Sequence, residues 1–431
     1  MSDKLSMEPY KGMRDFYPED FFILKHLFSA MRKEAESFGY EEYNGPTIEP
    51  TELYASKSSQ EIISEQSYSF IDRGEREVTL RPEMTPTVAR MVASRRRELG
   101  FPLRWFSIPT FFRYEQPQKG RLREHFQFNA DIFGVENIEA DVEIISLASE
   151  ILKTLGAKEE DFVIRIGSRK IISTLFEALS LSKEKERELS RLIDRRDKLP
   201  KEEYESGFMR IVGEDGKDLI SLFEAKELED FLSLTPPNFS APEAILELEN
   251  TLLGLKNSRI QNARFDPTLV RGFDYYSGIV FEIFDTNPNH RRAIAGGGRY
   301  DNLLSIFGEE KIPAVGFGMG DPMLQEFLKS RNLLPPFIPN TSLFLCQAPG
   351  ASIDFVEKTA QAFRKTGVNT AIDFSGRKVG DQIRSAVKHR IPFLICLGEK
   401  EKESGKFLLK NLETEQEEEL SFEEAVTRIR K

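Results

Sequence analysis

The chain has 431 residues, with 60 Lys and Arg against 71 Asp and Glu, and a formal net charge of −11. Its length predicts two or three domains that each bury a core, and its acidic balance excludes a generally basic nucleic-acid binder, because phosphate contacts need positive surface. No stretch approaches the roughly 20 apolar residues that cross a bilayer, and the start lacks the pattern of a targeting peptide, so we expect a soluble, cytoplasmic protein.

The cysteines and histidines are too few and too scattered to form a disulfide framework or a zinc site. Cys346 and Cys396 are the only cysteines, and they make no CxxC pair. The four histidines lack the short helical spacing of a zinc site; they are His26, His125, His290 and His389. We therefore predict no structural disulfide and no metal site built from protein ligands alone.

The N-terminal part alternates helical and extended segments. Hydrophobic residues recur at helical spacing over residues 20–38, and Gly39 follows as a stop. The next residues, GYEEYNGPTIEP, combine aromatic residues with two prolines, which favours an extended edge segment. Residues 78–134 are interpreted as two strands joined by a long loop rich in cations, QPQKGRLRE.

Three further segments follow. Residues 170–258 have the composition and periodicity of an inserted helical module, and the Pro-rich residues 331–340 are a predicted linker. Residues 341–431 alternate strands and helices, which predicts a small α/β domain with a parallel-biased sheet. Residues 341–400 hold nine Lys and Arg against five Asp and Glu, so nucleic-acid contact is expected to be local. The acidic run at 417–419 is interpreted as a solvated turn.

Two glycine clusters invite a nucleotide-binding interpretation that their spacing does not support. GGGRYD at 296–301 lacks the Lys-Ser/Thr ending of a P-loop, and GFGMGD at 316–321 has the spacing GxGxG instead of GxGxxG. From local sequence alone, these glycines are better explained by a tight turn or a close approach of backbones.

Polar side chains stand two residues apart at three places, the spacing that puts them on one face of a strand. These are Glu83 and Thr85; Arg113 and Glu115; and Gln127, Asn129 and Asp131. Beside a cationic loop, such a cluster predicts a pocket for a zwitterion and a polyphosphate. Carboxylates would hold an ammonium group, and guanidinium forks would grip phosphate oxygens.

Several segments, in order, carry a family resemblance. FRYE with its loop resembles motif 2 of class II aminoacyl-tRNA synthetases, and GYEEYNGP resembles their motif 1. LVRGFDYYSG at 269–278 and AGGGRYDNL at 295–303 resemble the two signature segments of histidyl-tRNA synthetases, and DFSGRKVGDQIRSAVKHRIPF resembles their anticodon-binding domain. The resemblance implies an α+β catalytic domain over residues 1–330, built on an antiparallel sheet with the helical insertion, and an α/β anticodon-binding-like domain over residues 341–431.

The resemblance also implies a histidine site. Glu83, Thr85 and Gln127 would hold the α-ammonium group, and Asp131 and Tyr276 would bond the two imidazole nitrogens. An adjacent tyrosine pair alone is more typical of packing between strands. The full set implied for histidine is Glu83, Met84, Thr85, Arg113, Gln127, Asp131, Arg271, Tyr275, Tyr276 and Tyr300.

For ATP, the resemblance implies that Arg113 and Arg271 are the catalytic residues that grip the α-phosphate, while Mg²⁺ arrives with the nucleotide. The set implied for ATP is Arg113, Glu115, Arg121, Arg123, His125, Phe126 and Arg271. The expected partners are histidine, ATP, tRNA(His) and, through motif 1, a second copy of the chain.

Three departures from the family pattern concern the ATP and tRNA sites. In motif 3 the family has Gly-Leu-Glu-Arg-Leu, but here Asp321, Pro322 and Met323 follow Gly320, so the clamping arginine is missing. Its replacement is left open among Arg121, Arg123, Arg291 and Arg292. Either His125 or Phe126 would stack on adenine, and Gln116 stands where the family often has an arginine.

Two other functions remain as alternatives. The missing arginine motivates a non-charging paralogue, the regulatory subunit of ATP phosphoribosyltransferase. A generic RNA-binding protein explains the basic stretch at 364–390 but leaves the pocket residues unexplained. For the helical module we expect a contact with the acceptor arm of tRNA.

Overall fold

A computed structural model describes residues 5–55, 66–118, 120–196, 199–213, 216–270 and 275–430. The chain divides into two compact units, Met1–Pro335 and Pro336–Lys431, and each has its own hydrophobic core. Within the described ranges, no helix is long and apolar enough to span a membrane.

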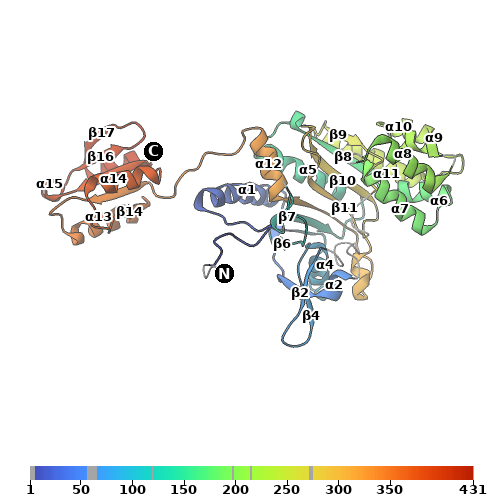
Figure 1. The fold of residues 1–431 in the computed structure, drawn as a ribbon, viewed down its shortest axis with the longest axis horizontal. Helices are drawn as coiled ribbons and strands as arrows, with labels where there is room; N and C mark the ends of the chain where they lie inside the picture. Colours follow the sequence, from blue (N-terminus) through green and yellow to red (C-terminus); the bar gives the residue numbers. More distant parts are fainter. Residues whose placement is uncertain are drawn as a thin grey trace. The chain divides into compact units, whose positions relative to one another are not determined.

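The first unit is built on a large, mostly antiparallel sheet (Figure 1). The path runs β1-β5-β7-β12-β11-β10-β8-β9, with β6 also paired to β7, and only the edge strands β1 and β9 join in parallel. The strands are β1 Glu41–Glu42, β5 Leu103–Ser107, β6 Thr110–Phe112, β7 Glu124–Phe133, β8 Phe162–Ser168, β9 Ala263–Phe265, β10 Ile279–Asp285, β11 Ala293–Arg299 and β12 Ala314–Gly320.

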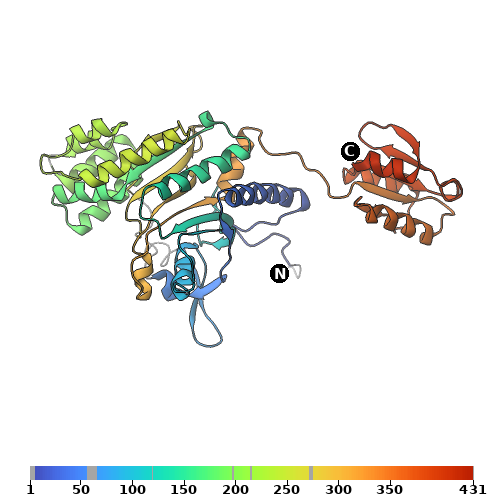
Figure 2. The ribbon, with the colours of Figure 1, turned by 180° about the vertical axis from the view of Figure 1, so that it is seen from behind.

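Helices α1 (Pro18–Ser37), α5 (Glu139–Thr154) and α12 (Asp321–Ser330) pack on this sheet, and Figure 2 shows α1 and α5 lying along it. The two faces of strand β7 carry different kinds of side chain, apolar on one and polar on the other. Its residues Phe128, Ala130 and Ile132 are buried in the main core. Because side chains alternate along a strand, Gln127, Asn129 and Asp131 lie on the opposite face.

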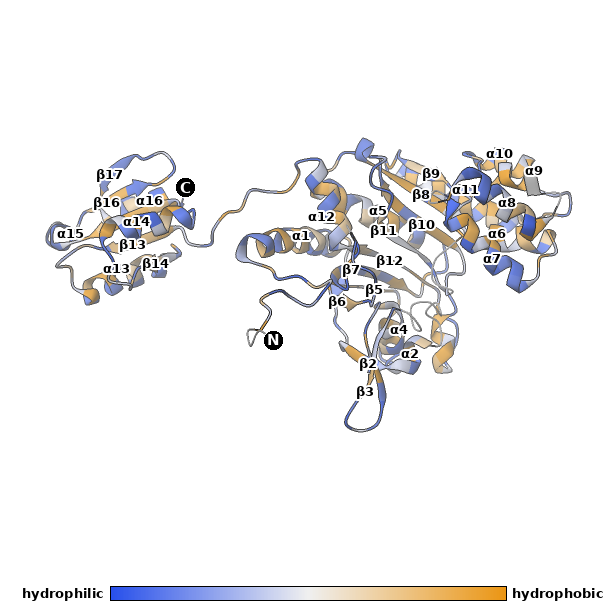
Figure 3. Cartoon of the chain, viewed as in Figure 1, coloured by the Kyte–Doolittle hydropathy of each residue, from blue (hydrophilic) through white to orange (hydrophobic). Residues whose placement is uncertain are grey.

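A smaller sheet lies beside that opposite face. Strands β2 (Ile48–Pro50), β3 (Tyr68–Ile71) and β4 (Glu77–Leu80) form it, and the turn between β3 and β4 is hydrophilic (Figure 3). The helices next to it are α2 (Thr51–Ala55), α4 (Thr85–Ser94) and the 3₁₀ segment η3 (Leu303–Phe307). The prediction that Glu83 and Thr85 share a strand was wrong: Thr85 begins α4, where Pro86 fits because the first helical turn needs no backbone donor.

The inserted module is helical as predicted, and it lies next to β8 and β9 (Figure 1). Ser168 and Ser182 each cap a helix with the side-chain oxygen, which satisfies a backbone N–H of the first turn. The helices are α6 Arg169–Ala178, α7 Lys183–Asp194, α8 Lys201–Val212, α9 Gly216–Leu222, α10 Leu228–Ser233 and α11 Pro242–Asn257, and the 3₁₀ segment η1 Glu159–Asp161 precedes β8.

The second unit is a separate α/β layer structure. Its sheet has the order β14-β13-β15-β16-β17, parallel among the first three strands and antiparallel among the rest, so the predicted parallel bias holds for one half. The acidic run is part of β17, which corrects the predicted turn. The elements are β13 Leu343–Gln347, α13 Ile353–Lys365, β14 Thr370–Ile372, α14 Val379–Lys388, β15 Phe393–Leu397, α15 Glu399–Ser404, β16 Phe407–Asn411, β17 Glu417–Leu420 and α16 Phe422–Arg430.

The predicted fold class is confirmed: an α+β unit on an antiparallel sheet carries a helical insertion, and a small α/β unit follows.

Candidate active site

Glycines let β11 and β12 form the floor of a small cavity. Gly316 pairs with Asp131 and Gly318 pairs with Asn129 across β12 and β7. A β-carbon at Gly316 would overlap the Asp131 carboxylate, and one at Gly318 would overlap the amide of Gln127. The glycine clusters therefore serve the close approach of backbones, and the space above them is left for a ligand.

The small cavity has a volume of about 40 Å³. Side chains from α4, β7 and the segment before β10 converge on it, although they are far apart in the sequence. Of the residues predicted to hold histidine, it is lined by Glu83, Met84, Thr85, Arg113, Gln127, Asp131, Tyr275, Tyr276 and Tyr300. The remaining one, Arg271, lies outside the described residues.

One end of this cavity is acidic. Glu83 is 3% exposed, and its Oε2 accepts a hydrogen bond of 2.9 Å from the Tyr275 hydroxyl. Burial raises the pKa of Tyr275, and the Glu83 carboxylate raises it further, so the phenol stays protonated and donates. A buried carboxylate held in this way is suited to an ammonium group.

Asp131 provides a second, separate carboxyl group. It is 4% exposed, and it accepts a hydrogen bond from the Tyr300 hydroxyl. Burial raises the pKa of Asp131 to about 7, and the bond from Tyr300 opposes that shift. Burial also raises the pKa of Tyr276, which lines the same cavity. Near neutral pH, Asp131 is therefore able to accept or to donate a hydrogen bond to a nitrogen ring.

Arg113 lies where two cavities meet. It lines the small cavity and also a larger one of about 1240 Å³. Its Nε donates 2.9 Å to the carbonyl of Pro82, which fixes the guanidinium plane. Burial lowers the pKa of Arg113 and Glu83 opposes this, yet a guanidinium group remains charged at any physiological pH. A fixed cation thus lies between an amino-acid-sized space and a nucleotide-sized space.

His125 and the Glu115–Arg121 pair belong to the larger cavity. Arg121 Nη2 donates 2.6 Å to Glu115 Oε1, and Glu115 is buried. Burial lowers the pKa of His125 to about 3, and the nearby Arg113 and Arg14 contribute to this shift. At neutral pH the imidazole is uncharged, so it offers a flat aromatic surface.

Two predicted ATP residues are not brought to the larger cavity. The Phe126 ring lies on the other face of β7, with its centroid 5.2 Å from that of Phe28 and 6.0 Å from that of Phe16. Arg123 stacks on Tyr114, with its guanidinium carbon 4.1 Å from the ring centroid. Of the two candidate rings, therefore, His125 faces the larger cavity.

At the motif 3 position the helix start is occupied by an ion pair. Asp321 accepts hydrogen bonds of 2.9 and 3.1 Å from the Arg14 guanidinium and one of 2.8 Å from the backbone N–H of Phe126. Met323 lines the larger cavity instead of an arginine. Arg14 was missed by the sequence analysis, since nothing in the sequence marks a contact across 307 positions.

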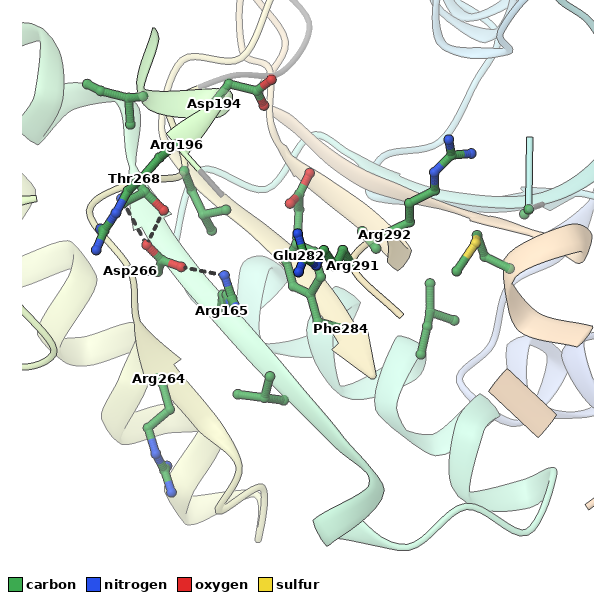
Figure 4. A pocket seen from close by; sticks show the side chains of 18 of the residues that line it. Arg165, Asp194, Arg196, Arg264, Asp266, Thr268, Glu282, Phe284, Arg291 and Arg292 are labelled. Carbon is green, nitrogen blue, oxygen red and sulfur yellow. Dashed lines mark hydrogen bonds and ion pairs between the residues drawn. The ribbon is translucent and has the colours of Figure 1, made fainter. Parts of the chain in front are cut away.

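Further cations line the larger cavity (Figure 4). Arg291 and Arg292 come from the turn between β10 and β11, and Arg292 Nη2 donates 2.7 Å to Gln118 Oε1 of the motif 2 loop. Arg165, paired at 3.3 Å with Asp266, lies on the wall next to the insertion. The cations that the sequence analysis did not select are Arg165, Arg196, Lys226 and Arg264.

Carboxylate side chains in the larger cavity are candidates for holding a cation. Glu115 and Glu282 line it, and carboxylate oxygens are the ligands that Mg²⁺ prefers in proteins. Within the described part of the chain, no three His, Cys, Asp or Glu side chains cluster as a metal site would require. The residues fit a metal ion carried by a phosphate ligand, with one or two carboxylates nearby.

Comparison with known proteins gives consistent matches over both units. The family described as histidyl-tRNA synthetase matches residues 12–321, and the anticodon binding domain matches residues 345–431. The histidine–tRNA ligase of Leptospira biflexa is 40% identical over 99% of this chain and 98% of its own, and that of Thermoplasma volcanium is 37% identical over 96% of each. The crystal structure of a histidyl-tRNA synthetase from Nostoc shares the fold, with a TM-score of 0.82, 23% identity and 99% of both chains covered.

Proposed function

This chain belongs to the histidyl-tRNA synthetase family, and from that premise we propose how its residues activate histidine with ATP and transfer it to tRNA. The activity is that of an ATP-dependent histidine–tRNA ligase. The observation that carries the assignment of roles is the position of Arg113 between the two cavities.

In the first step, a carboxylate oxygen of histidine attacks the α-phosphorus of ATP, and pyrophosphate leaves in line. Arg113 would hold the α-phosphate and offset the charge that develops on its oxygens. Arg271, which lies outside the described residues, would assist it, a role that rests on the resemblance alone. In the second step, a terminal ribose hydroxyl of tRNA(His) attacks the carbonyl of the adenylate and AMP leaves. Positioning does most of this work.

For recognition of histidine, we place the ammonium group at Glu83, Thr85 and Gln127. Asp131 and Tyr276 would bond the two imidazole nitrogens, while Tyr275 and Tyr300 hold the two carboxylates by hydrogen bonds. Buried hydrogen-bonding groups reject an amino acid that cannot pair with them by about 10⁴-fold or more, because the groups would be left unsatisfied. This accounts for selection of histidine over apolar amino acids of similar size.

On the ATP side, we propose that His125 stacks on adenine and that Arg292 replaces the missing motif 3 arginine. Arg292 supports this role because it lines the larger cavity and is tied to the motif 2 loop through Gln118. Arg121, held by Glu115, would contact the outer phosphates. Mg²⁺ would enter with ATP and neutralise phosphate charge, and Glu115 and Glu282, which line the same cavity, are the residues that would hold it.

Contacts with macromolecules are proposed for three surfaces. The exposed cations of α14 would meet the anticodon arm, and the helical module would meet the acceptor arm. The large apolar side chains Ile48, Phe70 and Ile71 are 47%, 45% and 72% exposed on the small sheet. Exposed apolar side chains of this kind mark surfaces that a partner covers, and we propose a second copy of the chain as that partner, in a homodimer. The alternative as a regulatory subunit is not better supported, since the matched relatives above are named as ligases.

The test is histidine-dependent exchange of labelled pyrophosphate into ATP, with each standard amino acid compared. We expect exchange with histidine alone, reduced about 100-fold or more in Arg113→Ala, since one preorganised charge contact contributes roughly that factor. The control is Arg95→Ala, an exposed residue at the end of α4. No exchange from folded wild-type protein, or equal exchange in Arg113→Ala, would overturn the assignment.

A further inference from the structure

The two cysteines lie side by side in the second unit. Cys346 of β13 and Cys396 of β15 are register partners in the parallel pairing of these strands. Paired strands are about 4.8 Å apart, which falls within the range of roughly 4.4–6.8 Å between the Cα atoms of a disulfide. Two thiols in this arrangement can be joined without separating the strands.

Both side chains also point to the same face of the sheet. Cys346 and Cys396 pack in one cluster with Ile383 and Ala386 of α14, whereas the other face is covered by α13 and α16. Cys346 is fully buried and Cys396 is partly exposed. One thiol is therefore accessible to a small oxidant, and the other lies behind it.

We propose that Cys346 and Cys396 form a reversible oxidation site, which hydrogen peroxide converts to an intramolecular disulfide. The disulfide in turn shifts the position of α14 on the sheet. The Cys396 sulfur attacks one oxygen of hydrogen peroxide and the O–O bond breaks, which yields a sulfenic acid. The hydroxide that leaves takes up the thiol proton and departs as water. The Cys346 sulfur then attacks that sulfenic sulfur; an S–S bond forms, the S–O bond breaks, and a second water leaves. Two thiols and one hydrogen peroxide thus give one disulfide and two waters, with two electrons passed to the peroxide.

The assignment of Cys396 as the attacking thiol follows from its surroundings. The hydrogen bond between the two thiols lowers the pKa of Cys396 and raises that of Cys346. Burial and the carboxylates of Glu401 and Glu417 oppose this lowering of the Cys396 pKa, and the cation of Lys410 on β16 supports it. Since the thiolate is the nucleophile, and since it is also the exposed partner, Cys396 reacts first and Cys346 resolves.

The consequence falls on α14 through a specific contact. Gln382 of α14 accepts a hydrogen bond of 3.0 Å from the backbone N–H of Gln347 and donates one of 3.1 Å to its carbonyl. Gln347 is the next residue after Cys346 in β13. Drawing the sulfurs to a bond length of about 2 Å moves them relative to Ile383 and Ala386, and a close-packed core passes that shift to the helix. This part rests on the proposed function, which places tRNA against the cations of α14.

The experiment uses the full chain, reduced and then freed of reductant. Hydrogen peroxide is added in steps, and thiols still present are counted by N-ethylmaleimide after unfolding, with peptide mapping to locate any cross-link. We expect labelled thiols to fall from two to none per chain, a Cys346–Cys396 cross-link, and recovery with dithiothreitol. Two labelled thiols after treatment, a link between chains, or Cys396 found only as sulfinic acid would each overturn the oxidation site.

The functional arm compares two activities on the same samples. Oxidation should lower tRNA charging about fivefold or more, which corresponds to about 1 kcal/mol. Histidine-dependent pyrophosphate exchange should stay within about twofold of the reduced protein. Cys346→Ser, which is nearly isosteric and cannot form the link, should keep both activities after treatment, and Cys396→Ala provides a second unlinked variant. A cross-link that leaves charging unchanged would overturn the effect on α14. Reduced protein without any exchange would instead count against the proposed function, while the thiol result would stand.

Discussion

At the scale of the residue, the most informative group is Asp131, because its environment makes its protonation sensitive to neutral pH. Its carboxyl group is buried, and its hydrogen bond comes from a neutral tyrosine hydroxyl. No cation contributes to its pKa shift, so burial dominates and raises the pKa to about 7. If Asp131 bonds the imidazole of histidine, as proposed, it does so in the pH range in which its own carboxyl group titrates.

Asp131→Asn should stabilise the catalytic unit, and the gain should depend on pH. Because the pKa of Asp131 rises from 3.8 when unfolded to about 7 when folded, the wild type loses stability as pH increases from about 4 to 7 and stays level above. The loss is on the order of a few kcal/mol. Melting temperatures of both proteins between pH 5 and 8.5 should diverge up to pH 7. Parallel curves would contradict the raised pKa.

Arg292→Ala should weaken the use of ATP selectively. If Arg292 holds the nucleotide, its loss removes a charged contact, and we expect the KM for ATP to rise about tenfold, equivalent to about 1.4 kcal/mol. The KM for histidine should stay within about twofold. Arg264→Ala, on another part of the same cavity wall, is the matched control. Equal effects in the two variants would show that Arg292 acts only through the overall charge of the cavity.

Some cations of the larger cavity could not be predicted from the sequence. Residues close in sequence, such as Gln127 and Asp131, could be placed on one face from the alternation of a strand. Arg165 and Arg264 are brought together only because β8 pairs with β9 across almost one hundred positions. Such long-range pairing leaves no local pattern in the sequence.

At the scale of the element, strands β11 and β12 explain why the site can exist within a packed sheet. Their glycines leave room for the side chains of Gln127 and Asp131, which line the small cavity. The sequence predicted this reason for the glycines, a close approach of backbones, and it predicted a pocket beside Gln127 and Asp131, but not that the glycines form the floor of that pocket. That cavity depends also on Glu83, Met84 and Thr85 at the start of α4, which line it together with the strands.

Gly318→Ala should therefore impair binding of histidine more than folding. The added β-carbon would meet the end of the Gln127 side chain, which can move aside but then leaves the ammonium site. We expect the KM for histidine in pyrophosphate exchange to rise about tenfold or more, at a cost in contacts of about 1–2 kcal/mol. Gly380→Ala, where no atom lies within 4 Å of the new carbon, should behave as the wild type. An unchanged KM in Gly318→Ala would argue against Gln127 as an ammonium ligand.

Three elements were predicted wrongly. Arg113 and Glu115 follow the end of β6 at Phe112, so they share no strand; for the other two, the physical reason is visible in the structure. Thr85 begins a helix because Pro86 favours a first helical turn, a preference that the alternation of polar residues concealed. The acidic run at 417–419 pairs with β16 as an edge strand, where Lys410 and Glu417 lie opposite each other at 2.9 Å. Charges are common on edge strands, because they discourage pairing with other chains.

At the scale of the whole molecule, the two units have separate cores, and the residues of both cavities belong to the first. The sequence analysis expected a boundary in the Pro-rich residues 331–340, because they contain no regular pattern and the composition changes on either side. What it could not predict was Arg14, which joins the N-terminal segment to α12 through Asp321.

Removing Pro336–Lys431 should separate the two steps of the reaction. Since the first unit has its own core and holds both cavities, the shortened protein should retain histidine-dependent pyrophosphate exchange within about threefold, whereas tRNA charging should fall by about 100-fold or more, equivalent to about 2.7 kcal/mol of lost binding. A circular dichroism spectrum would verify folding. Unchanged charging would show that the second unit does not contact tRNA.

The glycine floor of the histidine cavity has a consequence at the level of the gene. Any single-base change at the first or second position of a glycine codon introduces a side chain or stops the chain, and at Gly316, Gly318 or Gly297 that side chain would collide with backbone or with a ligand-binding group. Only silent changes at the third base of these codons would therefore leave the floor of the cavity unchanged. The most invariant part of this site should be the one that contributes no functional group at all.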